Sequence, residues 1–300
     1  MNITILGNGA WGRGLAFIGE KAGHDVAIWS RRAPDEGPIK NADAFILALP
    51  TQEAHGVLQG LNLAGKPLIS AAKGIERDSG KFLHELAKDL APASEFYALS
   101  GPSFAADVVQ GLPTAVTLAG PTLEKASNWA KILSLPTFRI YATDDVAGVE
   151  IGGAMKNVLA IACGIADGLQ LGDSARASLT TRGFAELSRF GRKLGAKPET
   201  LMGLSGLGDL LLTCSSQKSR NYSFGLALGQ GQSVVEALAH SKGIVEGAFT
   251  ASIAAKLSRK NHVEMPIVEA VSAIVDHGSK PGDEVKKLLA RPLGTEFKKE

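Results

Sequence analysis

The strongest constraint on the fold of this 300-residue chain is a change of pattern near residue 144. Before that point, short apolar runs alternate with helical stretches, whereas no convincing strand follows residue 142. Buried strands that are separated by helices are typical of a mostly parallel, doubly wound sheet. The sequence therefore predicts two domains, an α/β domain over residues 1–143 and an all-α domain over residues 144–300.

The individual elements follow from the same pattern. We expect strands over residues 2–6, 25–29, 44–49, 67–71, 95–99, 114–119 and 138–142. The helices expected between them cover residues 10–22, 52–61, 79–90, 103–110 and 123–133. In the second domain, we expect helices over residues 145–170, 174–194, 234–239, 250–258, 267–275 and 281–289.

One crossing between strands is short. Only residues 31–43 separate the second expected strand from the third, and Pro34, Gly37 and Pro38 within this stretch disfavour a helix. We therefore expect a plain loop that leads directly to the next strand.

A glycine motif follows the first strand and opens the first helix. Gly7, Gly9 and Gly12 form G-x-G-x-x-G. In this motif the first glycine suits a tight turn, the second lets the backbone approach a pyrophosphate, and the third lets helix and strand pack closely. The helix N-terminus, at Ala10 and Trp11, would offer N–H groups to the phosphates. This context favours a Rossmann-like, dinucleotide-binding domain over a plain glycine-rich turn.

The residues after the second strand indicate which dinucleotide binds. NAD sites usually carry an acidic residue there for the ribose 2′-hydroxyl, but this chain has Arg31 and Arg32. Guanidinium groups suit a 2′-phosphate because each presents a planar fork of donors. We therefore expect NADP to be preferred over NAD; two solvated loop arginines are the alternative.

Composition excludes several other classes of protein. A net charge of +2, from 32 basic and 30 acidic residues, gives no electrostatic reason to bind nucleic acid. No apolar run approaches the ~18 residues of a membrane span, and the N-terminus is typical of a strand, not of a signal peptide. Cys163 and Cys214 cannot form a disulfide framework, and the histidines lack zinc-site spacing. We therefore expect a cytoplasmic protein without a metal; whether it is a homodimer stays open.

Two lysines could exchange a proton with a carbonyl oxygen. Lys73 follows a buried strand, at the edge where ligands bind in open α/β sheets. Lys156 lies one helical turn after Gly152, and the pair Gly152 and Gly153 indicates that something approaches the helix backbone closely. A partly desolvated lysine near positive charge has a lowered pKa and can act as a general acid or base. The alternative is an ordinary solvated surface lysine.

Two later segments carry polar groups that could join this site. Asp209 could pair with an active-site lysine, or it could cap a helix that begins at Leu210. Ser219, Arg220 and Asn221 supply a hydroxyl, a guanidinium and an amide in succession. Such a trio can hold a phosphate through charge-assisted hydrogen bonds, although an ordinary polar loop has the same composition.

Eight segments of the chain, in order, resemble the bacterial NAD(P)-dependent glycerol-3-phosphate dehydrogenases. They are residues 7–12, 72–74, 100–105, 111–115, 152–157, 206–210, 219–221 and 245–247, so the likeness covers nearly the whole chain. The resemblance implies reversible reduction of dihydroxyacetone phosphate to sn-glycerol 3-phosphate with NAD(P)H, which supplies glycerophospholipid synthesis. The implied partner is therefore a small phosphorylated substrate.

The resemblance also implies roles for individual residues. Lys156 matches the family's proton-transferring lysine, Lys73 the lysine that touches cofactor and substrate, and Asp209 the acid beside them. The implied substrate contacts are Lys73, Gly101, Ser103, Lys156, Asp209, Ser219, Arg220 and Asn221. With the glycine motif and Arg32 included, the expected cofactor contacts are Gly7, Gly9, Ala10, Trp11, Gly12, Arg31, Arg32, Lys73, Ala105, Arg220, Ile244 and Glu246.

The chain departs from the family pattern in residues 31–43, where members have a longer segment. The adenine side of the cofactor site and the number of strands can therefore differ from those of the family. Ser103 stands where threonine is more usual, which keeps the hydroxyl. A reductase of another small acid, of a 2-hydroxyacid or ketopantoate type, shares this two-domain plan and is one alternative. A non-catalytic NADP-binding sensor or regulator is an alternative of a different class.

Overall fold

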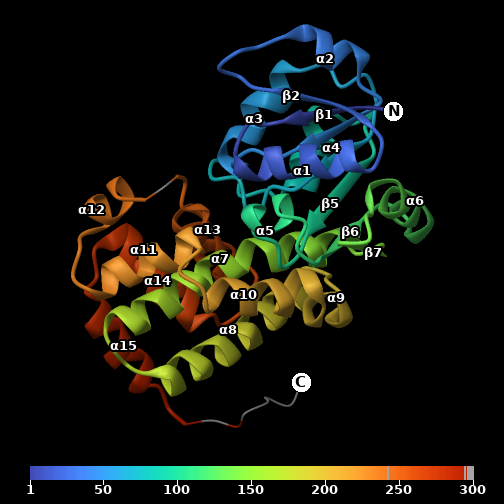
Figure 1. Ribbon diagram of the computed structural model, residues 1–300. Helices are drawn as coiled ribbons and strands as arrows, with labels where there is room; N and C mark the ends of the chain where they lie inside the picture. The colour runs from blue at the N-terminus through green and yellow to red at the C-terminus, as the bar shows by residue number, and fades with distance from the viewer. Residues whose placement is uncertain (242, 294, 296–300) are drawn as a thin grey trace.

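The N-terminal half forms a seven-stranded sheet and the C-terminal half is helical in the computed structural model, which describes residues 1–241, 243–293 and 295 (Figure 1). The strands are β1 (Asn2–Leu6), β2 (Asp25–Trp29), β3 (Ala44–Leu47), β4 (Leu68–Ser70), β5 (Phe96–Ser100), β6 (Thr114–Ala119) and β7 (Phe138–Thr143). They lie in the order β2-β1-β3-β4-β5-β6-β7, and only the β5–β6 pair is antiparallel. The predicted fold class is confirmed.

Helices cover both faces of the sheet. On one face lie α1 (Ala10–Lys21), α5 (Ala105–Val109) and α6 (Leu123–Leu133), and on the other lie α3 (Thr51–Gly60) and α4 (Leu83–Leu90). Strand alternation explains the split, because successive side chains of a strand point to opposite faces. On β1, Ile3 and Ile5 pack with α1, whereas Leu6 packs with α3 and α4.

The prediction of a plain loop over residues 31–43 is wrong. A short helix, α2 (Glu36–Asn41), lies within it. The Asp35 carboxylate accepts the N–H of Gly37 at 2.9 Å and caps the helix. Pro38 is tolerated because it falls in the first turn, where backbone N–H groups have no partner within the helix. The segment still adds no strand, so β3 follows β2 directly in the chain.

The helix α7 (Val146–Gly168) forms the centre of the helical half. It is buried continuously from Gly148 to Ala166. Around it pack α8 (Asp173–Lys193), α10 (Asp209–Cys214), α11 (Arg220–Gly229), α13 (Glu246–Lys260) and α14 (Pro266–His277). By length and composition alone α7 could cross a membrane, with a mean hydropathy of 1.4 over its most apolar window, but that window is wholly buried inside the protein.

The remaining elements of the helical half are short. They are α9 (Pro198–Met202), a π-helical segment (Leu204–Gly208), α12 (Val234–Ala239) and α15 (Pro281–Leu289). The sequence pattern did not predict α9, the π-helical segment or α11, and it offered α10 only as a helix that Asp209 could cap. In the other half, α4 begins at Leu83 and not at residue 79, because the Glu76 carboxylate accepts the N–H groups of Asp78 and Ser79 and holds a turn there.

Glycines allow α7 and α11 to cross at backbone contact. A Cβ on Gly164 would lie 2.1 Å from the carbonyl oxygen of Tyr222, and a Cβ on Gly225 would lie 2.1 Å from that of Ile161. Neither position can hold a larger residue without movement of the partner backbone. Part of the high glycine content, 35 of 300 residues, therefore serves helix packing.

Candidate active site

Three predicted residues meet at the carboxyl edge of the sheet. Lys73 follows β4, Lys156 lies in α7, and Asp209 begins α10. The two carboxylate oxygens of Asp209 each accept one ammonium group at 2.6 Å, Oδ1 from Lys156 and Oδ2 from Lys73. The carboxylate of Asp209 therefore binds the lysines, as the pairing alternative predicted, while Gly208 occupies the N-cap position of α10.

Burial strengthens the charge interactions within this cluster and shifts the pKa values of its members. The side chains of Asp209 and Lys156 are only 1% and 10% exposed. Burial lowers the pKa of Lys156; the Asp209 carboxylate opposes this shift and the charge of Lys73 adds to it, with the result at about 8. Burial also opposes ionisation of Asp209, but the charges of Lys156 and Lys73 outweigh it and hold the pKa of Asp209 below its usual value.

The neighbouring backbone holds the cluster in place. Lys73 Nζ also donates to the carbonyl oxygen of Gly101, at 3.1 Å, and the Ser103 hydroxyl donates to the same oxygen at 3.0 Å. Ser103 does not cap α5, whose N-cap is Phe104. Thr213, one turn after Asp209 on α10, donates its hydroxyl to the Asp209 backbone carbonyl at 2.6 Å.

The two glycines before Lys156 face the protein itself. A Cβ on Gly152 would lie 2.5 Å from the carbonyl oxygen of Ser205, and one on Gly153 would lie 2.9 Å from the hydroxyl of Ser100. The expectation of a close approach to this helix is thus met by the π-helical segment and by β5. Lys156 is fixed between these elements.

A chain of amides extends the site, and the sequence analysis missed its first member. Asn157 donates to the carbonyl oxygen of Lys73 at 3.3 Å and accepts from the Asn221 side chain at 2.9 Å. Asn221 in turn accepts the N–H of Gly247 at 2.9 Å. The position of Asn157 directly after Lys156 was the available signal. Through these bonds, α7, α11 and α13 are tied to the Lys73 loop.

The glycine motif has the geometry of a phosphate-binding turn. Gly7 has φ +128°, and a Cβ there would lie 2.6 Å from the carbonyl oxygen of Ala48. A Cβ on Gly12 would lie 2.0 Å from the carbonyl oxygen of Gly7, whereas Gly9 has open space around it. The first turn of α1, at Ala10 and Trp11, has no side-chain cap and no acidic residue. This helix N-terminus therefore suits an anion.

Another predicted residue, Glu246, begins α13 and contacts the start of α3. Glu246 Oε1 accepts the backbone N–H of Thr51 at 3.1 Å. Glu246 Oε2, the Thr51 hydroxyl and the indole N–H of Trp11 are buried and have no hydrogen-bond partner among the described residues. Burial raises the pKa of Glu246 to about 7, against the N–H of Thr51 and the charge of Arg220. The Thr51 hydroxyl and Glu246 Oε2 lie beside Gly74, and buried polar groups without a partner fit a bound polar ligand.

The other predicted contacts are more peripheral. Arg31 and Arg32 are exposed after β2, and Arg31 forms an ion pair with Glu53 of α3 at 2.5 Å. Arg220 and Ile244 are exposed in the helical half. Ser219 is buried and caps α11 by accepting the N–H of Tyr222. Ala105 begins α5, which packs on α1.

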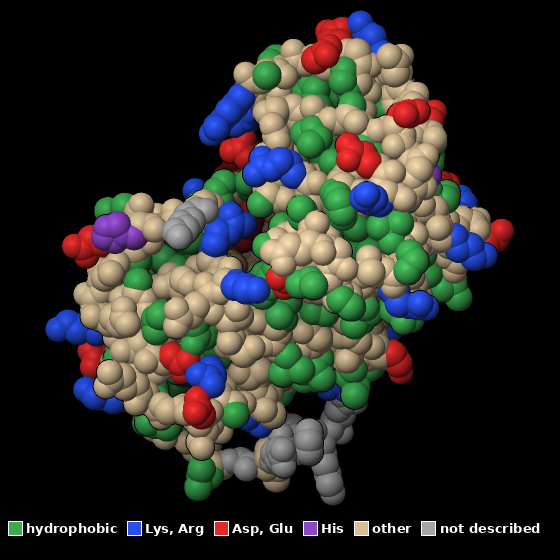
Figure 2. Space-filling model, viewed as in Figure 1, with side chains coloured by type: hydrophobic (Ala, Val, Ile, Leu, Met, Phe, Trp, Pro, Cys, Tyr) green, Lys and Arg blue, Asp and Glu red, His purple; other side chains and the backbone are tan. Residues whose placement is uncertain are grey.

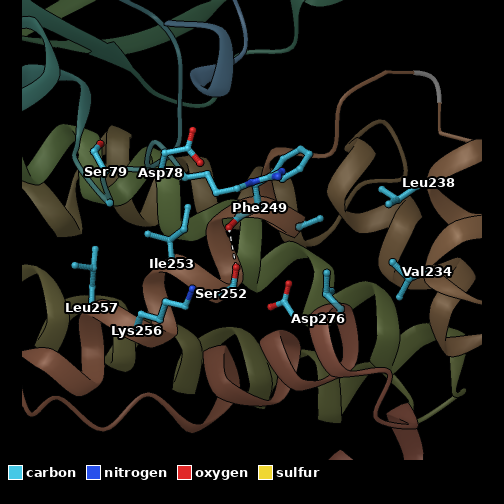
Figure 3. A pocket seen from close by; sticks show the side chains of 14 residues that line it. Asp78, Ser79, Val234, Leu238, Phe249, Ser252, Ile253, Lys256, Leu257 and Asp276 are labelled. Carbon is cyan, nitrogen blue, oxygen red and sulfur yellow. Dashed lines mark hydrogen bonds between the residues drawn. The ribbon is translucent and has the colours of Figure 1, made fainter. Parts of the chain in front are cut away.

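The molecular surface has a hollow between its two lobes and a separate groove in the helical half. Figure 2 shows Lys and Arg side chains along the hollow between the two lobes of the molecule. A separate groove of about 550 Å³ lies among α12, α13, α14 and residues 77–80, where the Arg77 guanidinium lies 4.3 Å from the ring centre of Phe249 (Figure 3). None of the predicted site residues lines this groove.

Within the described ranges, no group of three or more His, Cys, Asp or Glu side chains is arranged to hold a metal ion.

Comparisons with known proteins decide the family. Residues 2–41 and 36–126 match the model described as NAD-dependent glycerol-3-phosphate dehydrogenase N-terminus, and residues 145–286 match the corresponding C-terminus. The chain belongs to this family. A relative from Methylobacterium radiotolerans, named glycerol-3-phosphate dehydrogenase [NAD(P)+], is 47% identical over 97% of both chains. A relative of the same name from Parvibaculum lavamentivorans is 44% identical over 98% of both.

A solved structure of a family member has the same fold. The crystal structure of glycerol-3-phosphate dehydrogenase from Coxiella burnetii matches this chain with a TM-score of 0.92. It is 34% identical, over 96% of this chain and 98% of that one. The family resemblance inferred from the eight sequence segments is therefore confirmed.

Proposed function

We propose that this chain reversibly reduces dihydroxyacetone phosphate to sn-glycerol 3-phosphate with NAD(P)H, and so supplies glycerophospholipid synthesis. The observation that carries the proposal is the buried contact of Lys156 and Lys73 with one carboxylate, at the edge of the sheet where ligands bind. Family membership over nearly the whole chain supports the same substrate.

Lys156 is the proposed general acid. Its pKa of about 8 leaves it mostly protonated at neutral pH, yet acidic enough to give a proton to an alkoxide that forms at C2. In the oxidation direction the neutral amine would accept the proton of the C2 hydroxyl. Asp209 orients the ammonium group of Lys156 and keeps it in place as its charge changes.

Lys73 is proposed to contact both substrate and cofactor. An ammonium group has three donors, and two of those on Lys73 are directed at Gly101 and Asp209. The third is free to contact a substrate oxygen. The backbone at Gly101 and the hydroxyl of Ser103 lie beside it and would border the substrate, while Ser219, Arg220 and Asn221 would hold its phosphate from the helical half.

The residues present fit a dinucleotide. The α1 N-terminus behind Gly7, Gly9 and Gly12 would hold its pyrophosphate, and Arg31 and Arg32 a 2′-phosphate, so NADP is the proposed preference over NAD. The remaining proposed contacts are Ala10, Trp11, Lys73, Ala105, Arg220, Ile244 and Glu246. When bound, the reduced nicotinamide supplies the hydride that C2 receives.

The domain division after residue 143, the cytoplasmic location and the possible homodimer stay predictions. Support for the division comes from the position of the site, because Lys73 lies in the loop after β4 of the sheet, while Lys156 and Asp209 belong to helices. On this proposal the reaction takes place where the two halves meet.

The decisive experiment follows NADPH, and then NADH, by absorbance with dihydroxyacetone phosphate as substrate. We expect rapid oxidation of NADPH and slower oxidation of NADH. Ketopantoate and a non-phosphorylated ketone serve as controls and should give little turnover. Oxidation with ketopantoate alone would move the chain to another reductase class, and cofactor binding without any turnover would favour a sensor.

A further inference from the structure

A second buried ionic pair joins the sheet half to α7 close to the lysine cluster. Glu150 of α7 accepts the backbone N–H of His84 at 3.1 Å with Oε1, and its Oε2 pairs with His84 Nδ1. Glu150 is 6% exposed, whereas His84, near the N-terminus of α4, is 37% exposed. His84 therefore connects a buried carboxyl group with solvent.

A small cavity lies between Glu150 and Lys73. Its volume is about 10 Å³, which is close to what one water molecule needs, and its lining includes Ser70, Ser100, Glu150 and Lys73. Ser70 and Ser100 are the last residues of β4 and β5, at 2% and 4% exposure. Their hydroxyl oxygens have no hydrogen-bond partner among the described residues. Two unpartnered hydroxyls and the Glu150 side chain around a cavity of this size are the features of a buried water site.

Resting on the proposed function, we propose that Glu150 and His84 form a proton path between solvent and Lys73, completed by a water bound between Ser70 and Ser100. A buried acid needs such a path because Lys156 loses its proton at each reduction. The side chains on the path run from the surface at His84 to the cluster at Lys73.

The proton balance closes over one turnover. Lys156 gives one proton to the C2 alkoxide and becomes a neutral amine, which takes a proton from the neighbouring ammonium of Lys73. The protonated His84 gives a proton to the Glu150 carboxylate, Glu150 passes it to the bound water, the water passes a proton to the neutral amine of Lys73, and solvent reprotonates His84. Every group returns to its starting state, and one proton has moved from solvent to product.

The charges around the pair suit this role. Burial would lower the pKa of His84, but the hydrogen bond and charge of Glu150 outweigh it and raise the pKa. Burial raises the pKa of Glu150, against the opposing effect of His84. The other charged groups that act on the pair are Glu85 and Lys88 of α4, and their effects on His84 oppose each other. The pKa of each partner is therefore raised by the environment of the pair, which favours the protonated forms that the path needs.

The test compares one turnover with many. In Glu150→Gln, hydride transfer in a single turnover should keep its wild-type rate, because Lys156 starts protonated, whereas steady-state turnover should fall at least ten-fold. The steady-state rate of this variant should also fall further in D₂O than that of the wild type. Glu186→Gln, a buried acid of α8 away from the cavity, is the control and should change neither rate.

A second variant separates a proton path from a structural contact. His84→Ala should show the same steady-state loss, and added imidazole should restore turnover, because the position is accessible to a small buffer. Equal losses of rate in single and multiple turnovers, without rescue by imidazole, would make the pair a structural contact and overturn the proposal. Unchanged rates in both variants would also overturn it.

One measurement does not depend on turnover. A high-resolution crystal structure should show a water within hydrogen-bond distance of Ser70 and Ser100. Its absence would overturn the path even if dihydroxyacetone phosphate is the substrate. If the water is present but the wild type does not reduce dihydroxyacetone phosphate, the proposed function fails and the water site stands.

Discussion

At the residue scale, the state of Lys156 depends on a balance between burial and charge. Burial removes water from the ammonium group, and Asp209 restores part of the lost stabilisation. The sequence pattern selected Lys156, Lys73 and Asp209 but could not show that both ammonium groups lie 2.6 Å from the Asp209 carboxylate, because Lys73 and Asp209 are 136 residues apart in the chain. The contact depends on the packing of α10 on α7 and of α7 against β5, the strand next to β4 in the sheet.

The pH dependence of ketone reduction should report on Lys156. We expect kcat/KM for dihydroxyacetone phosphate to be high below pH 8 and to fall as the pH rises through about 8, because the acid loses its proton. In the oxidation direction the same group must be deprotonated, so the rate should rise through the same range. Steady-state rates between pH 6 and 10 would measure both limbs.

Removal of the amine tests the same assignment. Lys156→Ala should lower kcat by about 10²–10⁴-fold and abolish the limb near pH 8. Circular dichroism would check that the variant is folded. Near wild-type turnover in this variant would show that Lys156 is not the general acid.

At the scale of elements, the α7–α11 crossing depends on glycines that face the partner backbone. Gly225→Ala would place a methyl group 2.1 Å from the carbonyl oxygen of Ile161, so the helices must separate. We expect a loss of about 1–3 kcal/mol in the free energy of unfolding, measured in urea. Gly56→Ala on α3 is the control, since nothing lies within 4 Å of its Cβ position, and it should stabilise the protein by up to about 1 kcal/mol. Equal effects of both substitutions would contradict this account of the crossing.

The start of α14 depends on a buried carboxyl group of α8. Glu186 accepts the N–H groups of Ile267 at 2.8 Å and Val268 at 3.2 Å. Burial raises the pKa of Glu186 to about 7, against these two bonds. The folded state therefore holds a proton that the unfolded state releases above its ordinary pKa of 4.5.

Stability should consequently fall as the pH rises from about 4.5 to about 7. Glu186 lowers the free energy of unfolding by at most about 1.4 kcal/mol per pH unit. This decrease ends once the pH exceeds the folded-state pKa of Glu186. The free energy of unfolding of Glu186→Gln, measured in urea, should decrease less steeply with pH over this range. Glu246, whose pKa is also raised to about 7, contributes the same pH dependence in the wild type and in the variant. An identical slope in the variant would show that Glu186 titrates normally.

At the scale of the whole molecule, the predicted cofactor contacts come from both halves of the chain. Glu246 of α13 contacts Thr51 of α3, and Lys218, before α11, pairs with Asp107 of α5 at 3.2 Å. A ligand that binds across this junction should stabilise the folded molecule as a unit, by about 2.7 kcal/mol at a concentration of 100 times Kd.

Thermal unfolding can therefore measure the cofactor preference. NADPH should raise the Tm of the wild type more than the same concentration of NADH. The double substitution Arg31→Ala and Arg32→Ala should reduce the NADPH shift and weaken NADPH binding at least ten-fold, while the NADH shift stays nearly the same. Equal losses for both cofactors would show that these arginines do not recognise the 2′-phosphate.

The sequence by itself determined the alternation of strands and helices, the change to helices alone near residue 144 and the glycine turn before α1. These features depend on short-range periodicity and on backbone constraints that are visible locally. The tertiary structure alone decided that one carboxylate bridges two lysines, that Gly152 faces the carbonyl oxygen of Ser205, and that Glu246 contacts α3. These contacts join residues far apart in the chain, and their partners are chosen by how the helices pack on the sheet, which no local pattern records.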